Sequence, residues 1–211
     1  MGNNDKFVRY VAIVALLIAI VGVSVGFAAL TNTVNIKAGA EVRYSTPDTV
    51  AVLSTDDDSS QQGSVTPTTT GGATGDTASL GTDTIQSMKA HFTAPGQTVT
   101  YSFYGFNGSS FTSYLNSVVF GSKSCTAAQT NGATASYMNA ACNDITMSIK
   151  VGPGTGTTFT TDNTNVSGHS VAAGASEPIV VTITYANNGA VADGGFDVDF
   201  GTTVLTYSTV D

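Results

Sequence analysis

Short apolar stretches, separated by polar turn residues, run through most of the chain. The clearest of them, 145–151, has apolar residues at every second position, as expected for a strand with one buried face. Another, 98–106, follows the segment Ala94–Gln97, in which Pro95 and Gly96 favour a tight turn. Related patterns predict strands at 34–42, 49–53, 85–92, 114–120, 178–185, 195–201 and 203–207. Only 133–141 fits a short helix, so we expect an all-β fold of about eight to ten strands, arranged as a β-sandwich.

One long segment interrupts this pattern. Residues 54–82 are rich in Ser, Thr, Gly and Asp, and Val65 and Leu80 are their only large aliphatic residues. Such a composition offers too little apolar surface to offset the entropy of ordering the chain. We therefore expect a low-complexity insert at 54–82, an exposed loop or a disordered segment, within a sandwich domain that spans 30–211.

The N-terminal segment 1–29 is of a different kind. Lys6 and Arg9 precede an uncharged, mostly apolar run from Tyr10 to Leu30 that ends in small residues. A basic flank, an apolar centre and small residues at the end are the features of a secretory signal peptide. The run is also long enough to span a bilayer, so a retained hydrophobic anchor is the alternative. In both cases we expect a protein that is secreted and works outside the cell or at its surface.

Composition and charge narrow the range of partners. Only 10% of the residues are charged, against roughly 25% in an average soluble protein. The formal net charge is −8, which repels phosphate and argues against nucleic acid as a partner. The same charge repels an anionic lipid surface, so we expect contact with a membrane only through the N-terminal segment.

The two cysteines, Cys125 and Cys142, fit an exported protein. An even cysteine count in such a chain predicts a disulfide, which here would close a loop of about 18 residues and contribute about 3 kcal/mol. No further ligands stand near them at the spacing of a zinc site. Two free thiols are the alternative.

The chain lacks the residue patterns of a catalytic site. It contains no HExxH motif, no GxSxG motif and no glycine-rich loop that ends in Lys-Ser or Lys-Thr. His91 lies in a predicted strand and His169 in a Gly/Ser turn, and Glu41 and Glu177 are the only glutamates. We therefore predict no catalytic residues and no enzymatic activity; a secreted enzyme is the weakest of the alternatives.

Two further patterns concern ions and sugars. Three acidic residues near the C-terminus are candidate Ca²⁺ ligands, since hard cations prefer oxygen: Asp193, Asp197 and Asp199. Their spacing is not that of an EF-hand, and solvated acids at a sheet edge are the favoured alternative. We predict no other cofactor. Asn107-Gly-Ser and Asn165-Val-Ser match the pattern of N-glycosylation acceptors.

Three segments carry a resemblance to a known family. The N-terminal passage GVSVGFAALTNTVNIKAGAEV is similar to the exported N-terminus of the TasA/camelysin family, where small residues precede the first strand. The passage APGQTVTYSFYGFNGSSFTSYLNSVVFG resembles its strand, Asn-Gly turn and strand, and VVTITYANNGAVADGGFDVDFGTTVLTYSTVD resembles its last strands. The insert at 54–82 and the two cysteines depart from the family pattern.

This resemblance implies a jelly-roll-like β-sandwich and a role as the structural subunit of extracellular fibres in a biofilm matrix. The N-terminal strand of one subunit would complete the sheet of the next, so the main partner is a second copy of the chain. The donated strand would be Leu30–Ala38, with Val34 and Ile36 filling a groove and Leu30 and Ala38 at its ends. A head-to-tail contact that does not close into a ring gives a homopolymer.

Two other functions remain open at this stage. A cell-surface binding module, or adhesin, would use the 54–82 insert and the aromatic residues between 101 and 114 to bind matrix or cell-surface components. A pilin would retain the hydrophobic N-terminal segment as a packing helix. That arrangement usually has an acidic residue near the start of the apolar run, and this run has none.

Overall fold

The computed structural model describes residues 31–38, 43–44, 51–54, 63–80, 85–86 and 88–208. Within these ranges the chain forms short and long strands and a single helix. The first half contains β1 (Thr31–Ala38), β2 (Arg43–Tyr44), β3 (Ala51–Ser54), β4 (Ser64–Val65), β5 (Thr68–Thr70), β6 (Thr74–Gly75), β7 (Ala78–Leu80), β8 (Ile85–Gln86), β9 (Ala90–Phe92) and β10 (Thr98–Asn107). The second half contains β11 (Ser113–Val119), β12 (Ser124–Ala127), α2 (Ala135–Asn143), β13 (Ile145–Val151), β14 (Thr157–Phe159), β15 (Ser170–Val171), β16 (Ser176–Tyr185), β17 (Phe196–Asp199) and β18 (Gly201–Ser208).

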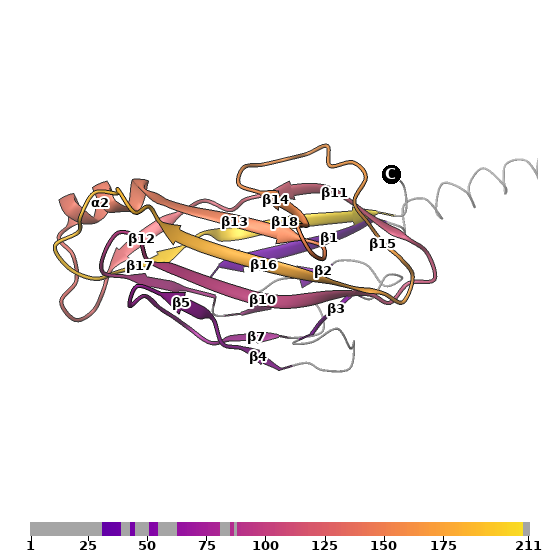
Figure 1. The fold of residues 1–211 in the computed structure, drawn as a ribbon, viewed down its shortest axis with the longest axis horizontal. Helices are drawn as coiled ribbons and strands as arrows, with labels where there is room; N and C mark the ends of the chain where they lie inside the picture. Colours follow the sequence, from indigo (N-terminus) through magenta and orange to yellow (C-terminus); the bar gives the residue numbers. More distant parts are fainter. Residues whose placement is uncertain are drawn as a thin grey trace, which may run out of the picture.

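Eight of the strands form a jelly roll (Figure 1). In chain order they are β1, β10, β11, β13, β14, β15, β16 and β18. The first pairs with the last, the second with the seventh, the third with the sixth and the fourth with the fifth, always antiparallel. The two sheets have the orders β15-β11-β18-β1 and β14-β13-β16-β10, with β2 and β3 added at one edge of each. This is the wrapped order of a jelly roll, and it confirms the expected all-β sandwich.

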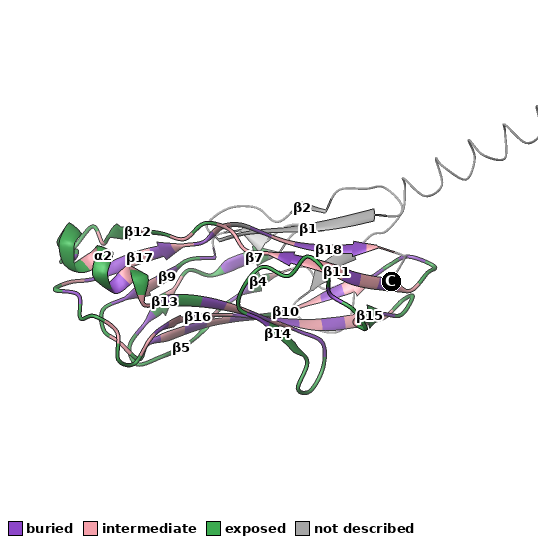
Figure 2. Cartoon of the chain, turned by 90° about the horizontal axis from the view of Figure 1, so that it is seen from above, coloured by how far each residue is buried: buried purple, intermediate pink, exposed green. Residues whose placement is uncertain are grey.

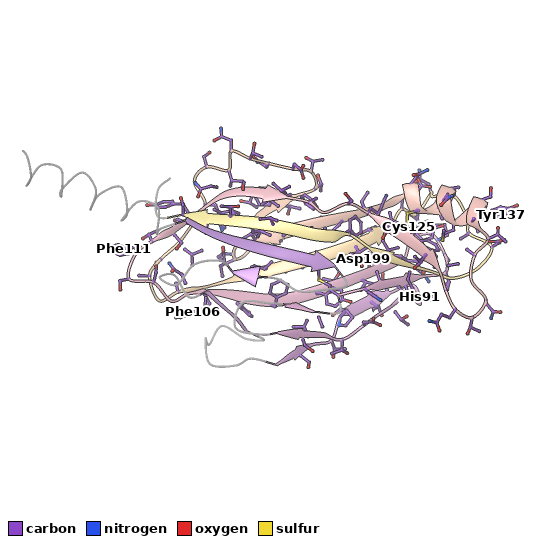
Figure 3. The ribbon with its side chains drawn as sticks, turned by 180° about the vertical axis from the view of Figure 1, so that it is seen from behind. His91, Phe106, Phe111, Cys125, Tyr137 and Asp199 are labelled. Carbon is purple, nitrogen blue, oxygen red and sulfur yellow. A yellow bond between two sulfur atoms is a disulfide. The ribbon has the colours of Figure 1, made fainter. Side chains whose placement is uncertain are left out.

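A further sheet, β12-β17-β9-β6, prolongs the first layer. β17 ends at Asp199 and β18 begins at Gly201, whose φ of 62° lets the chain bend as it passes from one sheet to the next. Figure 2 shows β12, β17, β18 and β11 in one layer and β13, β16 and β10 in the other. The molecule is therefore an elongated sandwich, with α2 at one end and Phe111 at the other (Figures 2 and 3).

Strict alternation of inward and outward residues builds the core between the layers. In β16 every second residue is buried, and β10 and β13 follow the same rule, as the alternating colours along these strands in Figure 2 show. At one end of the sandwich the rings of Phe92, Tyr185 and Phe196 meet with centroids 5.6–6.2 Å apart and join the layers. Of the aromatic residues between 101 and 114, Tyr101 and Phe103 belong to this core, whereas Phe111 is 62% exposed.

Residues 63–80 form strands instead of the loop or disordered segment expected for the insert at 54–82, although most of them are exposed. This stretch forms β4, β5, β6 and β7, in which β5 pairs with β10 and β6 with β9. Small side chains fill the core there, because Val65, Ala73 and Ala78 are all buried. Gln97 adds a polar link: its side chain accepts hydrogen bonds from the N–H groups of Thr93 and Ala94 and donates one to the carbonyl of Gly71. Residues 55–62 and 81–84 lie outside the described part.

Other boundaries differ from the expectations by a few residues. The first strand is 31–38 rather than 34–42, and the predicted helix is displaced by two residues to 135–143. The turn at 94–97 is confirmed, with Gly96 at a φ of 86°. Among the described residues, no helix has the length and apolar character needed to cross a bilayer.

Candidate assembly site

The N-terminal and C-terminal strands of the described chain lie side by side. All eight residues of β1 pair with β18 in one continuous antiparallel ladder, from Thr31 opposite Ser208 to Ala38 opposite Gly201. On its other side β1 has only two described pairings, with Arg43 and Tyr44 of β2. β18 is an inner strand, because β11 occupies its opposite edge. The ladder with β18 is thus the main described backbone contact of β1.

The alternate residues of β18 that face the core show which residues of β1 lie beside buried positions. Thr203, Leu205 and Tyr207 are buried, whereas Val204 and Thr206 between them are half-buried. The register sets Ile36 opposite Thr203 and Val34 opposite Leu205, and residues that face each other across a ladder share one face of the sheet. The side chains of β1 itself, and Leu30, lie outside the described part, so their role as groove fillers stays a prediction.

A chain of buried hydrogen bonds holds the end of β18 where β1 begins. The hydroxyl of Tyr207 donates to Oε1 of Glu177, a residue of β16 in the opposite sheet. Nε2 of His169, from the loop before β15, lies 2.6 Å from Oε2 of the same carboxylate. The side chains of His169 and Glu177 are 13% and 7% exposed, so both are largely removed from water. The hydrogen bond from His169 to Glu177 raises the pKa of His169 above its ordinary value, although burial acts in the opposite direction.

No motif in the sequence joins Tyr207, Glu177 and His169, although alternation contains a signal for two of them. Glu177 has the same parity as Ile179, Val181, Ile183 and Tyr185, all of which are buried. Tyr207 likewise has the parity of Thr203 and Leu205. A carboxylate in register with an apolar face has to find partners inside the protein. His169 carries no such signal, because it stands in a loop.

The predicted disulfide is confirmed. Cys125 of β12 and Cys142 of α2 are joined, with Cα atoms 6.2 Å apart, and no described cysteine is free. Figure 3 shows Cys125 near the end of the sandwich that carries Tyr137 of α2, far from Phe111 and Phe106. The bond therefore fixes α2 to the sheet β12-β17-β9-β6 at one end of the molecule.

The three candidate Ca²⁺ ligands have separate local partners. Asp193 accepts hydrogen bonds from the N–H and the hydroxyl of Thr134, directly before α2, at 2.8 and 3.0 Å. Asp197 lies 2.8 Å from Nδ1 of His91, and Asp199 accepts from the N–H of Gly201. Within the described ranges, no group of three or more His, Cys, Asp or Glu side chains has an arrangement that could hold a metal ion.

The two glycosylation patterns differ in their surroundings. Asn165 is exposed, whereas Asn107 is only 6% exposed. The side-chain amide of Asn107 donates to the carbonyls of Phe111, Val171 and Ala172, at 2.9–3.2 Å. In the folded protein this amide is thus committed to fixing two loops at the end opposite α2.

Comparison with known proteins finds no relative: no family model, no curated protein and no solved structure matches the chain. The resemblance to the TasA/camelysin family stays a prediction that rests on the quoted segments.

Proposed function

We propose that this protein is the structural subunit of an extracellular fibre in a biofilm matrix, which assembles by donation of β1 to the neighbouring subunit. The observation that supports this most is the position of β1: it is the first strand after the predicted signal segment, and it is bound mainly by one ladder with the last strand. A strand held in this way can be replaced by the same strand of another copy, and of the other described pairings only the two between β1 and β2 are affected.

Strand donation also suits the physical chemistry of the ladder. If β1 left, the edge of β18 would lose its ladder partner beside the buried positions 203, 205 and 207. An incoming β1 restores this ladder and contributes about 1.5–3 kcal/mol for each large aliphatic side chain that it buries. Pairing within one chain has the advantage of a high effective concentration, so fibre growth is expected to rise steeply with protein concentration at the site of export.

The test is a pair of double variants of β1 that place two aspartates on one or the other set of alternate positions. Val34→Asp/Ile36→Asp sets the charges opposite the buried residues Leu205 and Thr203, and the expected result is loss of fibres in electron microscopy. The matched control, Thr33→Asp/Asn35→Asp, sets them opposite the half-buried Thr206 and Val204 and should still form fibres.

A second measurement separates failed assembly from failed folding. A peptide of residues 30–38 should bind the Val34→Asp/Ile36→Asp protein and raise its melting temperature, because it fills the edge of β18 without linking subunits. Fibres from the Val34→Asp/Ile36→Asp variant, or an absence of fibres from the wild-type protein at every concentration, would refute strand donation.

A further inference from the structure

Three separate elements meet at the buried carboxylate of Glu177. Tyr207 comes from β18 in one sheet, Glu177 from β16 in the other, and His169 from the loop that leads into β15. The link therefore crosses the sandwich from the strand that holds β1 to the opposite layer. By register Tyr207 lies opposite Asn32, near the beginning of the β1 ladder.

The surroundings of this link are mostly neutral. Across the ladder on β10, Glu177 faces Gly105, and the carbonyl of His169 accepts from the N–H of Leu115 of β11. Gly152, directly after β13, lies against the His169 ring. A Cβ added to Gly152 would be 3.0 Å from Cε1 of His169. The titratable groups that the described structure places against Glu177 are His169 and Tyr207.

The charge state of His169 decides how strong the link is. The pKa of His169 is raised on folding, so the folded state holds the proton more tightly than the unfolded chain does. Its contribution to stability is fully present below the ordinary histidine pKa of about 6.5 and is lost as the pH rises through the higher folded value. Above that pH the imidazole is neutral, and its hydrogen bond to Glu177 is weaker because it is no longer assisted by the positive charge of the ring.

We propose that the chain of hydrogen bonds from Tyr207 through Glu177 to His169 is a pH-sensitive clamp, which fixes β18 while His169 is protonated and loosens it when His169 loses its proton. One consequence of the clamp rests on the proposed function: loosening of β18 makes the exchange of β1 between subunits faster at higher pH. Protonation would thus preserve a subunit in its self-paired form, and a rise in pH would release the strand for donation.

The test is hydrogen exchange of the full chain as a monomer, followed by mass spectrometry across pH 5.5–9 and corrected for the intrinsic exchange rate. For amides of residues 203–208, the protection factor should fall about ten- to hundredfold, the range for a hydrogen bond to a charged group. The chain has two histidines and its cysteines are bonded, so two variants assign the transition. His169→Gln should abolish the pH dependence, and His91→Gln should retain it.

A third variant tests the coupling to β18. Tyr207→Phe keeps the His169–Glu177 pair but breaks the link to the strand, so protection of 203–208 should become low and independent of pH. A wild-type protection factor that does not change with pH, or a transition that persists in His169→Gln, would overturn the clamp. If His169→Gln does not fold, a transition that persists in Tyr207→Phe overturns it instead. These results do not depend on fibres: a pH-dependent clamp in a protein that never polymerises refutes the proposed function alone.

Discussion

Glu177 stands at the end of a strand face that is otherwise apolar. A carboxylate taken out of water without partners costs several kcal/mol, so the hydrogen bonds from Tyr207 and His169 offset a penalty that the strand pattern itself creates. The geometry leaves little room for change, because Gly152 at a φ of 92° lies directly against the His169 ring.

A substitution at Gly152 tests how closely this site is packed. Gly152→Ala should lower the free energy of unfolding by about 1–3 kcal/mol, since a non-glycine residue is strained at this φ and its Cβ presses on His169. Gly154→Ala is the control, because an added Cβ there meets nothing within 4 Å. Chemical denaturation of both variants measures the difference, and equal losses would contradict the close contact with His169.

At the scale of single elements, the sequence predicts those strands well whose apolar residues alternate along the strand itself. β10, β13 and β16 were expected from alternation, and the structure confirms them because each buries its apolar residues on one face. β5, by contrast, consists of three exposed threonines and has no apolar pattern; its place is decided by pairing with β10, about 30 residues further along the chain. The pairing of β1 with β18 is more distant still and equally invisible to a local pattern.

The segment 63–80 should therefore matter for stability. Replacing it by a short Gly/Ser linker removes the pairings of β5 and β6 and takes the Asp76 carbonyl away from the Tyr101 hydroxyl, which is also bonded to the carbonyl of Lys89. We expect a loss of at least about 2 kcal/mol in urea denaturation, from the burial of Val65, Ala73 and Ala78 alone. Tyr101→Phe, the control that removes only the hydroxyl, should lose less; unchanged stability of the linker protein would mean that these strands are incidental.

The disulfide acts at the same scale. Cys125 and Cys142 are 17 residues apart, and a disulfide that closes a loop of that length stabilises the folded protein by about 3 kcal/mol. Cys125→Ala/Cys142→Ala should show this loss in denaturation while retaining fibres, because β12 and α2 take no part in the β1 ladder. Loss of fibres from a double variant that is still folded would place the α2 end of the sandwich in the subunit contact.

At the scale of the whole molecule, the wrapped order of the jelly roll sets a sequence of events. Among the described strands, β1 is made before all others and its main partner, β18, after all others. If the chain is exported as proposed, β1 has no partner strand in its own sheet until β18 has emerged, and it can pair first with a neighbour whose β18 edge is not yet covered by its own β1. The topology that pairs the first and last described strands is thus the feature on which the proposed exchange between subunits rests.

One covalent test distinguishes a donated strand from a retained one. Asn35 and Val204 face each other across the ladder, and Val204 is half-buried, so cysteines at both positions are close enough to form a disulfide when β1 and β18 pair. The Asn35→Cys/Val204→Cys protein is polymerised, then oxidised, denatured and separated by size without reductant. Strand donation predicts a ladder of covalently linked chains, because each new bond joins two subunits. Fibres that dissolve into single chains with an internal bond would contradict the account.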